Sequence, residues 1–177
     1  MFVLFGLAFL LNACSGPCNE VSETEREVTL EVFQSIVETR KTAGKILADQ
    51  YTAAGINDAE RFERWLARLQ AYVALNDSES MAKMIRYPVE VRIYDGSGEK
   101  RSFAGQRKLK QEIDDEKEFC KAYKAFMTNE LREVFNTSFD SLTINETPGS
   151  ILLKMGYVHI RAKQDSHPED YEVFFIF

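Results

Sequence analysis

The sequence is poor in positive charge, and this narrows the range of possible functions. Its 177 residues include 22 Lys and Arg against 28 Asp and Glu, which gives a formal net charge of −6. Nucleic-acid binding depends on clustered cations that neutralise phosphates. The charge balance therefore argues against DNA or RNA as a partner.

Sequence signatures of catalysis and of metal binding are also missing. No phosphate-binding glycine loop or nucleophile elbow is present, and Gly96-Ser-Gly98 fits a hairpin turn. The two histidines, His159 and His167, lack the ligand spacing of a zinc motif. The acidic run that begins at Asp114 fits a helix start, where carboxylates are favoured. The sequence therefore predicts neither a metal nor a cofactor.

Long apolar runs are absent except at the N-terminus. Residues 1–13 are almost entirely apolar, but a membrane-spanning helix needs roughly 20 such residues. A run of this length fits the apolar region of a secretory signal. Leu11-Asn-Ala-Cys14 then resembles the bacterial lipobox, in which lipid is attached to the cysteine and the chain is cleaved before it. The alternative is a buried N-terminal strand or helix.

The lipobox predicts the location of the protein. We expect residues 1–13 to be a signal peptide and the mature chain to begin at a lipidated Cys14, which attaches it to the membrane. Ser15, rather than Asp, follows the cysteine, so we expect the periplasmic face of the outer membrane. Asn76, Asn136 and Asn145 each begin an Asn-X-Ser/Thr triplet, which is irrelevant to a bacterial protein.

Cysteine is scarce, with three residues in the chain. If lipid occupies Cys14, then Cys18 and Cys120 remain and can pair in an oxidising compartment. The alternative is that Cys120 is a buried apolar residue and Cys18 is a free thiol in a linker. The sequence leaves both possibilities open.

The spacing of apolar residues divides the chain into a tether and one domain. Residues 14–23 are small and polar, as in a tether, and residues 24–177 have the length of a single domain. Thr24 and Glu27 fit a capping box for a helix that ends near Gly55. Its helical spacing rests on Val28, Phe33, Ile36, Val37, Ile46, Leu47 and Tyr51.

A second helix begins at Asn57 or Asp58 and buries the side that carries Phe62, Trp65, Leu66, Leu69, Tyr72 and Val73. A short third helix runs through Met81 and Ile85. The period then changes to two over residues 89–93, which predicts a strand that pairs with residues 100–103. We expect a helix over residues 109–135. The remaining strands are expected at residues 139–145, 150–163 and 171–177.

Helices therefore precede strands, which predicts an α+β fold with helices on one face of an antiparallel sheet. The chain also resembles the nuclear transport factor 2-like superfamily over residues 59–177. The resemblance rests on Leu75-Asn-Asp77, on Met84-Ile-Arg-Tyr-Pro-Val-Glu-Val91, on Glu118-Phe-Cys-Lys-Ala-Tyr123 and on the segment from Gly149 to Ile160. It implies a curved sheet that wraps around helices to form a cone with a pocket. The superfamily includes isomerases, dehydratases, transport factors and binding modules, and no catalytic residue carries over.

Candidate pocket residues follow from strand parity. Strand alternation places Tyr157, His159 and Arg161 on one face of a strand. If that face lines a pocket, a hydroxyl, a titrating base and a cation can bind a polar ligand. If it faces solvent, the three residues are the polar side of the strand. The same two interpretations, a pocket face or a solvated face, apply to Tyr87, Glu90 and Arg92 on an earlier strand. Asp140 is a candidate general base, although a turn also explains an aspartate there.

We therefore expect an envelope lipoprotein whose domain binds a small molecule or an envelope protein without catalysis. A first alternative is a small isomerase, hydratase or hydrolase that uses His159. A second is a structural or inhibitor-like protein that acts through a sheet face.

Overall fold

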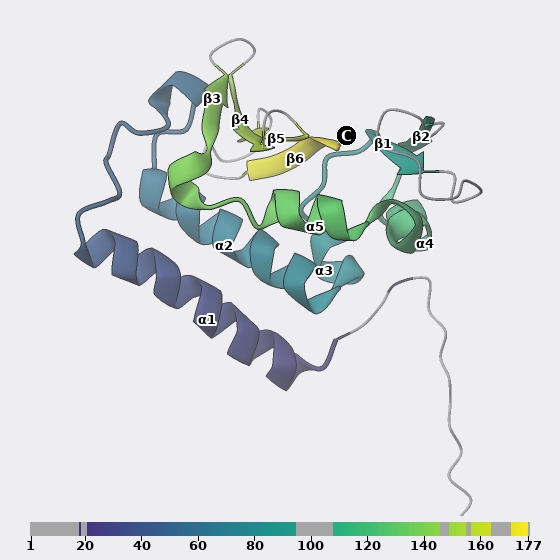
Figure 1. Ribbon diagram of the computed structural model, residues 1–177, viewed down its shortest axis with the longest axis horizontal. Helices are drawn as coiled ribbons and strands as arrows, with labels where there is room; N and C mark the ends of the chain where they lie inside the picture. Colours follow the sequence, from purple (N-terminus) through teal and green to yellow (C-terminus); the bar gives the residue numbers. More distant parts are fainter. Residues whose placement is uncertain are drawn as a thin grey trace, which may run out of the picture.

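The computed structural model describes Cys18 and residues 21–94, 108–145, 149–154, 157–163 and 171–176. Five α-helices and two 3₁₀ helices are found in this part of the chain (Figure 1). They are α1 (Glu23–Thr42), η1 (Thr52–Ala54), α2 (Ala59–Leu75), α3 (Ser78–Ala82), α4 (Glu116–Phe126), α5 (Asn129–Phe135) and η2 (Phe139–Ser141). None of the helices in the described ranges has the length and apolar character needed to cross a bilayer.

The described strands form two antiparallel sheets. They are β1 (Val89–Tyr94), β2 (Lys108–Ile113), β3 (Thr143–Asn145), β4 (Ser150–Leu153), β5 (Val158–Ala162) and β6 (Tyr171–Ile176). β1 pairs with β2, and the larger sheet has the order β3-β4-β5-β6. The predicted α+β class is confirmed.

The segment before β1 joins the two sheets. The backbone N–H of Arg86 donates to the carbonyl of Val173 at 2.8 Å, and the N–H of Val173 donates to the carbonyl of Met84 at 3.0 Å. These bonds place residues 84–86 along the free edge of β6, and β1 continues beside that strand. Figure 1 shows the larger sheet above α2 and α5, β1 and β2 above α4, and α1 on the far side of α2.

Capping side chains set where the first two helices begin. Ser22 accepts a hydrogen bond from the N–H of Glu25 at 3.3 Å, so the cap of α1 lies two residues before Thr24, the predicted cap. Asp58 accepts from the N–H of Arg61 at 2.9 Å, which confirms it as the cap of α2. The prediction that α1 extends to Gly55 is wrong, because the helix ends at Thr42 and Gly44 takes a left-handed conformation.

The largest correction concerns residues 109–135, which are not one helix. Their first part is β2, whose Ile113 lies opposite Val89 of β1. Asp115 then caps α4, and Thr128 caps a separate α5. The strand predicted at residues 100–103 lies outside the described residues. Residues 150–163 form two strands rather than one, and residues 139–141 form η2.

The core forms where α2 meets the larger sheet. Phe62, Leu66 and Leu69 are fully buried, and the Phe62 ring lies 5.3 Å from that of Tyr171 on β6. Trp65 is 7% exposed, with its ring 5.8 Å from the Tyr171 ring. The apolar side predicted for this helix is therefore the buried side, except that Tyr72 is only partly buried.

The predicted apolar side of α1, in contrast, is partly wrong. Val37 is fully buried and Phe33 packs against the core, but Val28 and Ile36 are 57% and 42% exposed. Buried contacts on this helix also come from a charged residue, Arg40, which is 8% exposed.

We expect Trp65→Ala to lower the free energy of unfolding by about 3–5 kcal/mol, the range for truncating a buried large aromatic side chain. Urea denaturation monitored by circular dichroism measures this change. Arg68→Ala, at an exposed position of the same helix, is the control and should stay within about ±0.5 kcal/mol. Equal effects of the two substitutions would place Trp65 outside the core.

Candidate functional site

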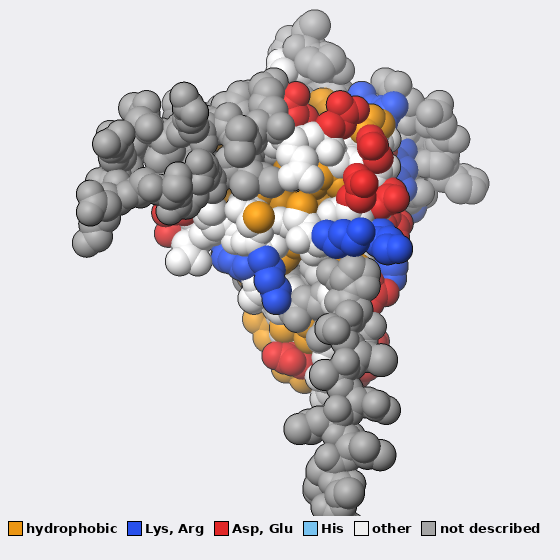
Figure 2. Space-filling model, turned by 90° about the vertical axis from the view of Figure 1, so that its right-hand side faces the viewer, with side chains coloured by type: hydrophobic (Ala, Val, Ile, Leu, Met, Phe, Trp, Pro, Cys, Tyr) orange, Lys and Arg blue, Asp and Glu red, His pale blue; other side chains and the backbone are white. Residues whose placement is uncertain are grey.

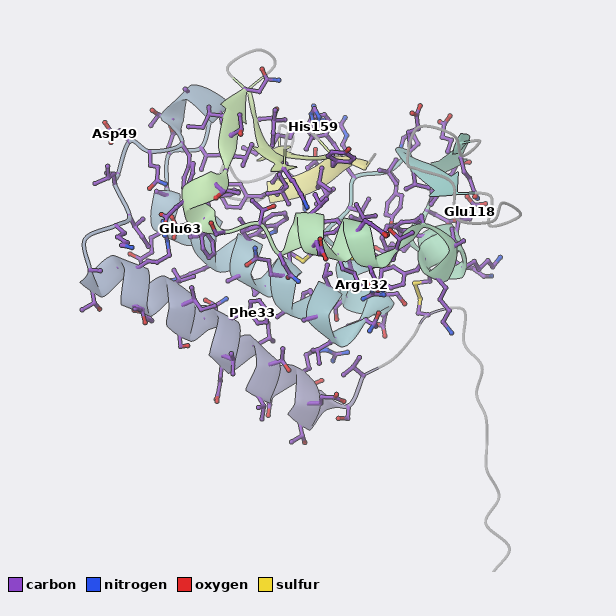
Figure 3. The ribbon with its side chains drawn as sticks, in the orientation of Figure 1. Phe33, Asp49, Glu63, Glu118, Arg132 and His159 are labelled. Carbon is purple, nitrogen blue, oxygen red and sulfur yellow. A yellow bond between two sulfur atoms is a disulfide. The ribbon has the colours of Figure 1, made fainter. Side chains whose placement is uncertain are left out.

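A buried cluster of polar side chains joins α1, η1, α2 and η2. Arg40 binds Glu63 through two hydrogen bonds, from Nε to Oε2 at 2.8 Å and from Nη2 to Oε1 at 3.1 Å. The hydroxyl of Tyr51 donates to Glu63 Oε1 at 2.9 Å, and Arg40 Nη1 donates to Asp140 Oδ1 at 2.7 Å. Glu63 is fully buried, whereas the Asp140 side chain is 65% exposed. Figure 3 shows Glu63 between α2 and the segments that supply its partners.

The electrostatics of this cluster favour a structural role over proton transfer. The hydrogen bond to Glu63 raises the pKa of Arg40, which stays a cation. Burial, followed by the charge of Glu63, raises the pKa of the Tyr51 hydroxyl. The hydrogen bond from Arg40 lowers the pKa of Asp140, which makes its carboxylate a weaker base. A general base works best with a pKa near the working pH. The lowered pKa of Asp140 therefore does not favour that role.

The Tyr157, His159 and Arg161 row lies along β5. Val158 and Ile160 between them are fully buried, so His159 and Arg161 lie on the opposite face of the sheet. The Phe174 ring of β6 lies between them, with its centroid 5.5 Å from the His159 ring and 4.6 Å from the Arg161 guanidinium carbon.

The charge of Arg161 is compensated within the sheet. Its Nε donates to Glu172 Oε1 at 3.1 Å, and Arg86 Nη1 approaches the same oxygen at 3.4 Å. Glu172 lies directly opposite Arg161 across the β5-β6 pair. Cross-strand pairing of opposite charges stabilises a sheet, so the pair has a structural reason. Tyr157 packs against the hydrophobic core.

The three other candidates, Tyr87, Glu90 and Arg92, lie just before β1 or on it. The hydroxyl of Tyr87 donates to the carbonyl of Ala82 at 3.0 Å, and its ring packs edge-on against Phe119 of α4. Burial raises the pKa of Tyr87. Glu90 and Arg92 lie on β1, and the side chain of Arg92 is outside the described part of the structure. The predicted site residues therefore occupy three neighbourhoods: the Arg40 cluster, the outer face of β5 and the junction of β1 with α4.

The structure joins Cys18 and Cys120 by a disulfide, one of the two possibilities that the sequence leaves open. The bond links the segment before α1 to α4 across a separation of 102 residues. Closing a long loop of this kind stabilises a fold chiefly by restricting the unfolded chain. Cys14 and the predicted signal peptide lie outside the described residues.

A polar depression forms where the C-terminal end of α2 meets α5. Its volume is about 480 Å³, and it is lined by Val73, Ala74, Asn76, Asn129, Arg132 and Asn136. Figure 3 shows Arg132 between α5 and the α2–α3 region. Arg132 Nη1 donates to the carbonyl of Val73 at 3.1 Å, and the same carbonyl accepts from the backbone N–H of Asn76 at 3.2 Å.

The walls of this depression are also fixed by a buried side chain on α2. Gln70 is 5% exposed, and its Nε2 donates to the carbonyls of Phe135 and Thr137, each at 2.9 Å. These bonds hold α2 against the C-terminal end of α5. The depression is therefore lined by three asparagines and an arginine on elements held in a defined geometry.

Sequence reasoning missed this depression. Its polar residues come from two helices separated by more than 50 positions, and no local motif connects them. Asn76 and Asn136 each begin an Asn-X-Ser/Thr triplet, but this motif does not predict which helices pack together. Within the described ranges, no group of three or more His, Cys, Asp or Glu side chains could hold a metal ion.

The surface charge is mixed where it can be seen. On the face in Figure 2, acidic side chains gather along one side with Lys and Arg beside them. This arrangement agrees with the net negative charge of the chain. No protein-family model, no curated protein and no solved structure matches this chain.

We expect Arg40→Met to lower the free energy of unfolding by about 3–5 kcal/mol, because it leaves the buried Glu63 carboxylate without its cation. Lys41→Met is the matched control, since Lys41 forms an exposed pair with Glu60 worth at most about 1 kcal/mol. The double variant Arg40→Met/Glu63→Leu should recover part of the loss. Equal effects of Arg40→Met and Lys41→Met in urea denaturation would contradict a stabilising role for the cluster.

Proposed function

We propose that this protein is a bacterial envelope lipoprotein, anchored through lipid on Cys14, whose domain binds a polar ligand without catalysing a reaction. The lipobox-like sequence at residues 11–14 supports the anchoring. The polar depression between α2 and α5 supports binding, and it is the observation that carries this proposal.

We also propose that the domain is of the cone-shaped nuclear transport factor 2-like type. Support comes from the bonds between residues 84–86 and β6, which bring β1 beside the larger sheet. Continued pairing there would give the strand order β2-β1-β6-β5-β4-β3. Helix α2 packs on the buried face of that sheet, as the helices of such a cone do.

The chemistry of the depression indicates the class of ligand. Asn129 and Asn136 line the depression, and the donors and acceptor of a carboxamide suit hydroxyl groups. A guanidinium is the group best suited to bind a carboxylate. Its volume of about 480 Å³ falls in the range of roughly 300–1,000 Å³ for small-molecule pockets. A hydroxylated carboxylate, such as an acidic sugar, fits this combination.

The groups considered for catalysis or for ligand binding on η2 and β5 are engaged in structural contacts. Asp140 is bound by Arg40, and Arg161 is bound by Glu172. His159 lies on the face of β5 opposite to Val158 and Ile160, packed against Phe174. These contacts favour binding over chemistry.

We expect Arg132→Gln to weaken the binding of glucuronate at least about tenfold, because the substitution removes the charged partner of the carboxylate. Glucose, which has the hydroxyl groups but no carboxylate, should bind more weakly than glucuronate to the unmodified chain. Chemical-shift titration by NMR measures both affinities. Arg68→Gln, an exposed arginine of α2 outside the depression, is the control and should leave them unchanged.

Two outcomes of that experiment would contradict the proposal. Equal binding of glucose and glucuronate that is insensitive to Arg132→Gln would remove the depression as the site. Conversion of either sugar to a product, abolished by His159→Ala in a folded variant, would favour the enzyme instead. Unfolding midpoints of all variants show whether a loss of binding reflects a loss of structure.

We expect Cys14→Ser to leave an uncleaved, unlipidated precursor and to abolish membrane attachment, because the acyl chains on this residue supply the anchor. Mass spectrometry of detergent extracts together with membrane fractionation measures both effects. Cys18→Ser is the matched control, since it removes the disulfide but should retain lipid. Unlipidated native protein that still carries residues 1–13 would rule out the proposed anchoring.

A further inference from the structure

Three aliphatic side chains lie in a row on the outer face of α1. Val28, Val32 and Ile36 follow one another at four-residue spacing, which places them on one face of the helix. They are 57%, 58% and 42% exposed. Within the described residues, the other exposed large hydrophobic side chains are Leu47, at 58%, and Ile144, at 36%.

The folding of α1 does not explain this row. β-Branched residues lower helix propensity slightly, and on an exposed face they gain little by burial. α1 instead packs against α2 through its opposite side, where Val37 and Arg40 are buried. Exposed helix positions usually carry polar residues of high helix propensity, and departures from this pattern without a gain in stability are expected at functional surfaces.

The charge that surrounds the row is negative. The three cations of α1 are each bound by a carboxylate on α2 or in the turn that follows it, in the pairs Arg26–Asp77, Arg40–Glu63 and Lys41–Glu60. Glu25, Glu27 and Glu31 are exposed, and no ion pair engages them within the part of the chain that the structure describes. Glu25 and Glu31 are each three residues from Val28 and therefore border the row. The outer face of α1 thus combines aliphatic contact area with acidic charge.

We propose that the outer face of α1 is a docking surface for a cationic amphipathic helix of another protein. The row from Val28 to Ile36 is about 12 Å long at 1.5 Å per residue, which matches about two turns of a partner helix. Such a partner would bring an aliphatic stripe to the row and Lys or Arg to the flanking carboxylates. This proposal stands independently of the depression between α2 and α5.

Charge complementarity distinguishes this partner from two others. A second copy of the chain would bring two acidic faces together, at a cost from like-charge repulsion. An anionic lipid surface would also repel Glu25, Glu27 and Glu31, because such surfaces attract basic segments. A basic helix satisfies both the apolar row and its acidic border.

The probe for this surface is an 18-residue helical peptide of Leu and Lys in amphipathic order. We expect it to bind the full chain, produced without lipid, with an affinity that falls as salt increases. Val32→Gln should weaken binding about tenfold, the loss expected from one buried aliphatic contact. Leu47→Gln is the matched control, since Leu47 has the same 58% exposure outside the row, and it should have no effect. Fluorescence anisotropy of the labelled peptide measures these affinities.

The charged border is tested separately. Glu31→Gln should weaken binding and reduce its salt dependence, whereas Asp49→Asn, at an exposed carboxylate outside α1, should change neither. A peptide with Glu in place of Lys, and a Leu/Lys peptide in scrambled order, should fail to bind. Unchanged unfolding midpoints show that each variant is folded.

Several results would overturn the proposal. One is that Val32→Gln and Leu47→Gln weaken binding equally. The others are that the Leu/Glu peptide binds, or that the Leu/Lys peptide does not bind. Dimerisation that Val32→Gln abolishes in analytical ultracentrifugation would assign the row to a second copy. Sedimentation with phosphatidylcholine or phosphatidylglycerol vesicles that Val32→Gln abolishes would assign it to the membrane.

Discussion

The arrangement of this fold depends on two buried carboxylates, Glu63 and Asp77, both 0% exposed. A buried carboxylate without a partner is strongly destabilising, so each must meet a cation in the folded state. Arg40, near the C-terminal end of α1, binds Glu63, and Arg26, near its N-terminal end, binds Asp77 at 2.7 Å. Asp77 also caps α3. The two pairs hold α1 against α2 at both ends and determine how α1 is rotated about its axis.

That rotation has a consequence for the surface of the molecule. With Arg26 and Arg40 turned toward α2, the aliphatic row of α1 is directed outward together with its exposed glutamates. The same constraint places Asp140 beside Arg40, because Glu63 leaves one side of the guanidinium available. The charged residues that first suggest chemistry are thus part of the framework. The polar depression lies elsewhere, at the end of α2, where Gln70 and Arg132 fix its walls.

Particular elements show where sequence reasoning succeeds and where it fails. Helix α2 could be predicted because its apolar residues recur at helical spacing after a capping aspartate, and both signals are local. Strand β2 was missed because residues 108–113 have no strong strand pattern, and their pairing with β1 is a long-range interaction. The apolar residues of α1 suggested a buried side, but ion pairs with α2 outweighed that preference.

The sequence by itself determined the α+β class, the apolar side of α2, the alternation of β5 and the net negative charge. Each of these follows from spacing or composition within a short segment. Only the tertiary structure decided that Arg40 meets Glu63, that Cys18 bonds Cys120 and that three asparagines gather around Arg132. These contacts join residues far apart in the chain. They are determined by how whole helices pack, which no local pattern records.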